Sequence, residues 1–328
     1  MILELDRLTV DYGRFRALHE LTLQFRGGAI GLLGPNGAGK STMIRAILGM
    51  LKAAGGSGKV LGLDIRKDGV EIRRRVGYMS ERDSFPPHLN AVQWLTLLAE
   101  LSGLPERYAR ERAHECLWFA GMEEARYREV ETFSVGMKQR VKLAAALVHG
   151  PELVFLDEPT NGLDPAGRRQ MLELCKSLKE KHGIHTILAS HLLPDVEFVC
   201  TQVMVLSKGR LQAFGPIDEM KRTDKKAYVV RVAGSMELFV KTLRERGAIA
   251  SEPDRRGTII ELAEGVQRDF IFDVARSVET PVLEFSVLQR SLEEVFLDSL
   301  RAGEAADKLN RNNATRGGDA PPVLAGRK

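Results

Sequence analysis

Gly34-Pro35-Asn36-Gly37-Ala38-Gly39-Lys40-Ser41 is a complete phosphate-binding loop of the form G-x-x-x-x-G-K-[ST]. The apolar run before it, Ala29 to Leu33, is typical of a buried parallel strand, and apolar residues after it are spaced as in a helix. Glycines let backbone N–H groups approach a β-phosphate, and the helix that follows adds partial positive charge. Lys40 would contact the β- and γ-phosphates, while the Ser41 hydroxyl would bind Mg²⁺. The stretch therefore predicts a nucleotide site built from a strand, a loop and a helix.

The composition is that of a globular protein. The chain has 328 residues, of which 44% are hydrophobic, enough for one large α/β domain and a smaller one. A net charge of only +4 argues against a dedicated nucleic-acid binder, so no nucleic-acid partner is expected. The three cysteines form no C-x-x-C pair and are typical of reduced thiols in a cytosolic protein. No stretch reaches the ~18 to 20 apolar residues of a membrane span, and the first residues lack a signal-peptide core. We expect a cytoplasmic protein that reaches a membrane only through a partner.

The order of apolar and polar segments predicts two domains. Residues 1–220 alternate apolar runs with helical segments, which is typical of an α/β domain with a mostly parallel sheet. Residues 221–226 are charged and predict a linker. Residues 227–300 alternate strand-like and helical segments and predict a small α+β domain, with a ferredoxin-like arrangement as the candidate topology. The polar segment 301–328 predicts a disordered tail.

Two carboxylates follow the apolar run Leu153–Leu156. Asp157, at the carboxyl edge of a central strand, is placed to hold Mg²⁺ through water. Glu158 would point elsewhere and act as a general base on the attacking water. The alternative is a buried strand followed by a solvated acidic turn. The phosphate-binding loop earlier in the chain and the Pro159–Asp164 run behind it favour the catalytic interpretation.

A third motif, Phe133-Ser134-Val135-Gly136-Met137-Lys138-Gln139-Arg140, precedes these carboxylates. Ser134 is a candidate N-cap and Gly136 would allow a close approach, so the start of the following helix is a candidate anion site. A capped helix without a ligand is the alternative interpretation. The position of the motif between the phosphate-binding loop and Asp157 favours the anion site.

With these motifs in this order, the chain resembles the ATP-binding subunit of an ABC transporter over residues 1–300. The resemblance is carried by Gly34–Thr42 as Walker A, Phe133–Arg140 as the signature, Leu153–Glu158 as Walker B, Asn161–Asp164 as the D-loop, and His191 after Ala189-Ser190 as the switch histidine. Tyr12 stands where the family stacks an aromatic ring on adenine. The resemblance implies a P-loop NTPase domain with a helical subdomain at residues 82–150, and ATP and Mg²⁺ as cofactors.

The resemblance also implies a mechanism and partners. His191 would sense the γ-phosphate and orient Glu158. Two chains would form a head-to-tail homodimer on binding ATP, in which the Walker residues of one chain face Ser134 and Gly136 of the other. Asp164 of the D-loop would also bind the nucleotide. A separate integral-membrane permease would contact the helical subdomain, where residues 85–101 carry an apolar stripe. Core packing is the alternative interpretation of that stripe.

One residue departs from the common family pattern. Glu81 stands where the family usually has a glutamine, although the exporter subgroup often carries glutamate there. A carboxylate at this position would ligate Mg²⁺ or orient water, but when ionised it donates no hydrogen bond. Both roles stay open.

Within the family, the chain resembles ATPases of ABC-2-type exporters, which include antibiotic, polysaccharide and sodium efflux systems. The resemblance rests on the Glu158–Pro165 run, the C-terminal unit and its ending Ser291–Leu297. The alternative is an ABC ATPase without a transport role, acting as a regulatory or assembly module in a soluble complex. The short separation of Lys40 and Asp157 excludes the chromosome-structuring type, which places a long coiled coil between the two motifs. The transported substrate is set by the permease and not by this chain.

Overall fold

The computed structural model describes residues 1–222, 227–253, 257–263, 265–288 and 290–303. These residues form two compact units. The first comprises Met1–Ile217 together with the described residues from Phe296 to Gly303, and the second comprises Asp218–Val295.

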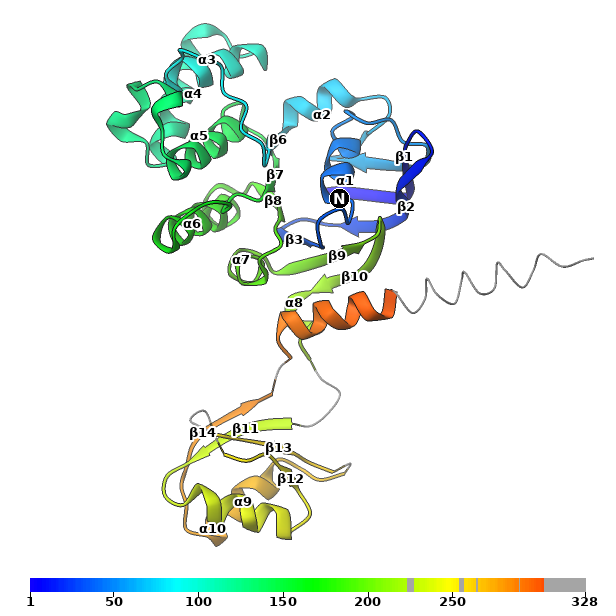
Figure 1. The fold of residues 1–328 in the computed structure, drawn as a ribbon, viewed down its shortest axis with the longest axis vertical. Helices are drawn as coiled ribbons and strands as arrows, with labels where there is room; N and C mark the ends of the chain where they lie inside the picture. Colours follow the sequence, from blue (N-terminus) through cyan, green and yellow to red (C-terminus); the bar gives the residue numbers. More distant parts are fainter. Residues whose placement is uncertain (223–226, 254–256, 264, 289, 304–328) are drawn as a thin grey trace, which may run out of the picture. The chain divides into compact units, whose positions relative to one another are not determined.

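A six-stranded sheet forms the centre of the first unit (Figure 1). In spatial order its strands are β10 (Arg210–Pro216), β9 (Gln202–Ser207), β3 (Ala29–Leu33), β8 (His185–Ala189), β7 (Leu153–Asp157) and β6 (Val76–Met79). All neighbours pair in parallel except β10, which is antiparallel to β9. The mostly parallel sheet predicted from the apolar runs is thus confirmed, and β3 and β7 are buried along their whole length, as strands covered on both faces must be.

A second, antiparallel sheet adjoins the first and was not part of the sequence-based prediction. Its order is β2 (Phe15–Phe25), β1 (Leu3–Tyr12), β4 (Gly55–Val60) and β5 (Leu63–Asp64). Helix α1 (Lys40–Ile47) packs between the two sheets, because its buried side chains share one apolar core with residues of β1, β2 and β3. This core fixes the helix that begins at the end of the phosphate-binding loop.

The remaining helices of the first unit are α2 (Gly69–Arg75), α3 (Ala91–Leu101), α4 (Glu106–Phe119), α5 (Val135–Leu147), α6 (Pro165–His182) and α7 (Leu193–Val199), with short 3-10 turns η1 (Glu123–Tyr127) and η2 (Val130–Thr132). The short helix α8 (Ile217–Met220) begins at the last residue of Met1–Ile217 and continues into the second unit. Figure 1 shows α3, α4 and α5 gathered beyond the β6 edge of the sheet, where the helical subdomain was expected. Figure 1 also shows α6 and α7 on the side of the sheet opposite α1. Asn90 caps α3 in a reciprocal arrangement with Gln93, which explains why the helix begins at Ala91.

The second unit is a four-stranded antiparallel sheet covered by two helices. Its elements are β11 (Ala227–Val232), α9 (Met236–Glu245), β12 (Ile249–Ala250), β13 (Thr258–Glu261), α10 (Asp269–Ser277) and β14 (Val282–Val287). The strand order β12-β13-β11-β14 confirms the ferredoxin-like topology predicted from the sequence. Apolar residues of the sheet and both helices form its own core, which includes Phe239 and Ile260.

The last described part of the chain forms a helix over residues 292–303. We expected the disordered tail to begin at 301, but residues 301–303 are still helical. Arg301 pairs with Asp298 one turn earlier, at 3.7 Å, which favours continuation of the helix. The rest of the predicted tail, 304–328, and most of the predicted linker, 223–226, lie outside the described residues.

Candidate active site at the phosphate-binding loop

The phosphate-binding loop connects the end of β3 to the start of α1 at the carboxyl edge of the central sheet. A Cβ atom at Gly34 would lie 2.4 Å from the carbonyl oxygen of Leu206, so glycine alone fits there without a shift. Gly37 has a φ of 80°, in the left-handed region that glycine adopts without strain. Lys40 is buried, and its Nζ donates to the carbonyl oxygens of Gly34 (2.6 Å) and Pro35 (3.4 Å). The ammonium is thereby held inside the loop, where a phosphate oxygen can replace a carbonyl oxygen as acceptor.

Asp157 ends strand β7 and faces the first residue of α1 after Lys40. The Ser41 hydroxyl donates to Asp157 Oδ2 at 3.1 Å, and the Tyr78 hydroxyl donates to the same atom at 3.3 Å. Burial raises the pKa of Asp157, the hydrogen bonds from these hydroxyls lower it, and the neighbouring Glu81 raises it further. A buried carboxylate beside a hydroxyl is a donor set of hard oxygens, which suits Mg²⁺. Ser41 and Asp157 are therefore the residues that fit the predicted metal.

Glu158 follows Asp157 but turns to a different partner. Its backbone adopts the left-handed region, with φ of 51°, and its N–H donates to the carbonyl oxygen of Ala189 at 2.9 Å. Its carboxylate Oε2 lies 2.9 Å from Nδ1 of His191. Glu158 is buried, whereas the His191 side chain is about half exposed, at 53%. The two adjacent carboxylates are thus separated in role: one faces Ser41 and the other faces His191.

Asp157, Glu158 and His191 line one cavity of about 610 Å³ together with residues 36–42 of the phosphate-binding loop. Glu81 and Tyr12 lie on its wall, as the sequence predicted, and Asn161 of the predicted D-loop joins them. Phe15, which pairs with Tyr12 in the β1–β2 hairpin, also lines the cavity and is 68% exposed. Phe15 was not predicted from the sequence, although an aromatic residue three positions after Tyr12 could have indicated a second ring at the site.

Ser134, Gly136 and Asp164, which were predicted to bind the nucleotide, do not line this cavity, and neither do Gly34 and Pro35 at the start of the phosphate-binding loop. Ser134 caps α5, its hydroxyl accepting from the N–H of Met137 at 3.3 Å. Asp164 caps α6 in the same way, accepting from the N–H of Gly167 at 3.2 Å. The chain therefore assembles one half of the predicted site in a single cavity and leaves the signature residues outside it.

A buried ion-pair network supports the segment between Glu158 and α6. It was not predicted from the sequence. Asp195 on α7 is 1% exposed and accepts from Thr160 Oγ1 at 2.6 Å and from Arg168 Nε at 2.7 Å. A buried carboxylate requires such partners. The network joins the D-loop segment, α6 and α7, and no local motif marks it in the sequence.

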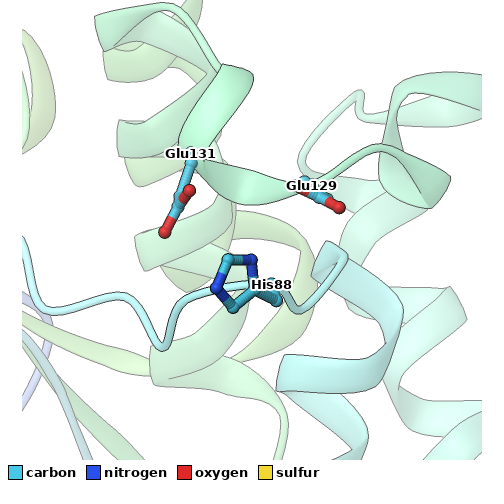
Figure 2. Close-up of side chains that lie close together, drawn as sticks. All are labelled: His88, Glu129 and Glu131. Atoms are coloured by element: carbon cyan, nitrogen blue, oxygen red, sulfur yellow. The ribbon is translucent and has the colours of Figure 1, made fainter.

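A second group of potential metal ligands lies in the helical subdomain (Figure 2). His88 precedes α3, and Glu129 and Glu131 lie at η2; their ligand atoms are within 4.8 Å of one another. All three residues are exposed, and exposed groups of this kind commonly gather on protein surfaces without a metal. The group lies outside the cavity that contains Ser41 and Asp157.

This chain is similar in sequence to known proteins. The family described as ABC transporter matches residues 18–161. An uncharacterized ABC transporter ATP-binding protein of Nostoc sp. is 36% identical over 281 residues, which cover 84% of this chain and 81% of the relative. The chain belongs to the ABC transporter ATP-binding proteins. A daunorubicin resistance ATP-binding protein of Streptomyces coeruleorubidus is 32% identical over 315 residues, 91% of this chain and 98% of that protein.

A solved ABC cassette supports the same assignment. It is a dimer in a post-hydrolysis state bound to ADP and Pi, with a TM-score of 0.61 and 25% identity, covering 66% of this chain and 99% of its own. The present chain is thus an ABC ATPase with the P-loop NTPase fold. In the described part of this ABC ATPase, no helix has the length and apolar character needed to cross a membrane.

Proposed function

We propose that this ABC ATPase powers an ABC-2-type exporter by hydrolysing ATP in a dimer of two copies that docks on a separate membrane permease. The relative from Streptomyces coeruleorubidus supports the export direction, since it is named for daunorubicin resistance and matches nearly along its whole length. The main support for a dimer is that one chain brings only part of the predicted ATP site together. The phosphate-binding loop, Asp157, Glu158 and His191 line one cavity, whereas the signature residues Ser134 and Gly136 do not line it.

Hydrolysis would use the residues of this cavity in separate roles. Glu158 accepts the proton of the attacking water, and His191 holds the Glu158 carboxylate in orientation through the 2.9 Å contact. Lys40 offsets the charge that develops on the transferred phosphoryl group. Bound Mg²⁺, which Ser41, Asp157 and Glu81 would hold, would supply further charge neutralisation at the phosphates. Tyr12 and Phe15 offer aromatic faces to the adenine ring.

The second half of each site would come from the other copy. The start of α5 presents Ser134, and the neighbouring Val135 is 53% exposed, which leaves the signature open to a partner. A γ-phosphate contacted from both sides favours the closed dimer, and its loss on hydrolysis lets the dimer open. ATP turnover would in this way drive an opening and closing motion.

The permease would dock in a groove of about 330 Å³ between the sheet edge and the helical subdomain. Trp94, Leu98 and Leu101 of α3 line it, and Leu101 is 76% exposed. Val92 and Leu95, on the other side of α3, are buried, so core packing accounts for that part of the predicted stripe. The groove is thus formed by the residues that the helix core leaves free, and it suits the apolar face of an amphipathic helix.

Recovery of a membrane protein with the tagged chain tests the transport role. We expect Leu101→Asp to abolish recovery of a multi-helix membrane protein from detergent-solubilised membranes while ATP binding is unchanged. Leu97→Asp is the matched control, because Leu97 lies on the same helix, is 44% exposed and does not line the groove. Equal recovery with both variants would contradict the docking site, and a purely soluble partner would favour the regulatory or assembly role instead.

A further inference from the structure

Lys142 is a buried cation that the proposed hydrolysis does not use. It lies on α5, two turns after the signature residue Ser134, and its side chain is 6% exposed. Among the described lysines only Lys40 and Lys142 are buried, and Lys40 belongs to the phosphate-binding loop. A buried ammonium is costly unless its hydrogens are satisfied, so its partners identify what it holds.

Both partners lie on the segment that carries Glu81. The Nζ of Lys142 donates to the backbone carbonyl oxygen of Glu81 at 2.9 Å and to Asp83 Oδ1 at 3.1 Å. Asp83 is about half exposed, at 53%, so the ion pair draws one surface carboxylate onto a buried cation. The two bonds fix the backbone at Glu81 and the residue two positions later to the same atom of the signature helix.

The Glu81 segment separates two different surfaces. Glu81 lines the nucleotide cavity beside Asp157. Arg82, Ser84 and Lys142 instead line the groove of about 330 Å³ that is proposed to bind the permease. The Lys142 ammonium therefore holds the backbone of Glu81 from the side of the groove. Any displacement of this backbone moves the Glu81 carboxylate relative to Asp157 and the phosphate-binding loop.

We propose that Lys142 is a positioning residue that sets the place of the Glu81 carboxylate in the nucleotide cavity. The inference rests on the proposed function in one respect, namely that Glu81 contacts Mg²⁺ at the bound nucleotide. Glu81 would be the group that contacts the metal, and Lys142 would act through the backbone of Glu81 without reaching the cavity. The signature helix and the Mg²⁺ site of one chain are thereby joined by a single side chain.

The test measures metal-dependent nucleotide binding rather than turnover. Fluorescently labelled ATP is titrated against the full chain with Mg²⁺ and with EDTA, and the ratio of the two affinities reports the metal contribution. Lys142→Met keeps the length of the side chain and removes the ammonium. We expect it to lower the ratio at least fivefold, with the affinity in EDTA changed less than twofold. Lys181→Met, at an exposed lysine on α6 that lines neither the nucleotide cavity nor the groove, is the control and should leave the ratio unchanged.

A double variant separates positioning from a purely structural effect. Glu81→Ala should lower the ratio as Lys142→Met does, and the combination should lower it no further, because both changes remove the same contact. Full additivity, or an unchanged ratio in Lys142→Met, would overturn the inference. An unchanged ratio in Glu81→Ala would instead overturn the role of Glu81 in the proposed function. If Lys142→Met fails to fold, Asp83→Asn at the half-exposed partner is read by the same criteria.

Discussion

Nδ1 of His191 lies 2.9 Å from Oε2 of Glu158, although the two residues are 33 positions apart in the sequence. The parallel pairing of β7 and β8 brings them together, because Asp157 is the register partner of Ala189 at the carboxyl ends of the two strands. Glu158 directly follows Asp157, and His191 lies two residues after Ala189. The pairing of β7 with β8 therefore brings Glu158 near His191, and the left-handed φ of Glu158 lets its side chain reach the imidazole.

Removal of the imidazole tests this relationship. We expect His191→Ala to lower kcat by about 10- to 100-fold, because the general base loses its orientation, with little change in ATP affinity. Steady-state turnover and equilibrium binding of labelled ATP measure the two quantities. His88→Ala, at an exposed histidine outside the cavity, should retain wild-type turnover. A His191→Ala variant with wild-type kcat would contradict the role of His191 in orienting Glu158.

The two hydroxyls on Asp157 should differ in function. Ser41→Ala removes the group that fits Mg²⁺, and we expect the Mg²⁺ requirement for nucleotide binding to rise more than tenfold. Tyr78→Phe removes only a hydrogen bond to the same Oδ2 atom, so the Mg²⁺ requirement should change less than threefold while stability falls by about 1 kcal/mol. Labelled-ATP titrations over a range of Mg²⁺ and urea unfolding measure both effects. Equal Mg²⁺ effects from the two variants would contradict a metal-ligating role for Ser41.

Two glycines of the loop should respond differently to alanine. A Cβ at Gly34 would meet the Leu206 carbonyl oxygen at 2.4 Å and the Ala38 Cβ at 2.8 Å, so Gly34→Ala must displace the loop. We expect ATP binding to be lost and stability to fall by about 1 to 3 kcal/mol. Gly37→Ala meets no atom within 4 Å and carries only the strain of its positive φ, about 1 kcal/mol. Calorimetric binding and thermal unfolding compare them, and equal losses would argue against the steric explanation.

Acid should destabilise the first unit through His185. Its Nδ1 accepts from the N–H of Gly28 at 2.9 Å, and burial, followed by the nearby Lys179, lowers the pKa of His185. Since the folded-state pKa is below the unfolded value of about 6.5, the unfolded chain takes up the proton first. The stability present above pH 6.5 is therefore lost as the pH falls below it.

An asparagine at this position tests the prediction. His185→Asn retains an acceptor oxygen but has no titrating ring, so stability should decline less between pH 7 and 5.5 than in the wild type. Urea unfolding across this range gives the difference. His149, whose pKa is also lowered by burial, contributes equally to both proteins and cancels in the comparison. Parallel pH dependence of the two proteins would exclude His185 as a source.

The parts of the molecule that the sequence predicted are those specified by short segments. The phosphate-binding loop, the run ending at Asp157 and the cap at Ser134 each depend on neighbours within a few residues, and each lies where it was expected. The βαββαβ order of the second unit likewise follows from alternating local periodicities.

Partnerships between distant residues could not be predicted in this way. The antiparallel sheet joins β1 to β4 across about fifty residues, and its register is set by the core it shares with α1. Asp195 meets Thr160 and Arg168 only because α7 and α6 pack together, and Lys142 reaches Glu81 across 61 positions. Such contacts depend on tertiary packing, which leaves no periodic signal in the sequence.

The most direct test of the composite ATPase site is the behaviour of Glu158→Gln. Purified wild-type protein and the variant are compared for phosphate release and for ATP-dependent mass by light scattering coupled to gel filtration. We expect slow turnover by the wild type, and a variant that binds ATP, releases no phosphate and accumulates as a dimer. A Glu158→Gln variant that hydrolyses ATP at the wild-type rate and stays monomeric with ATP would contradict both the role of Glu158 and the shared site.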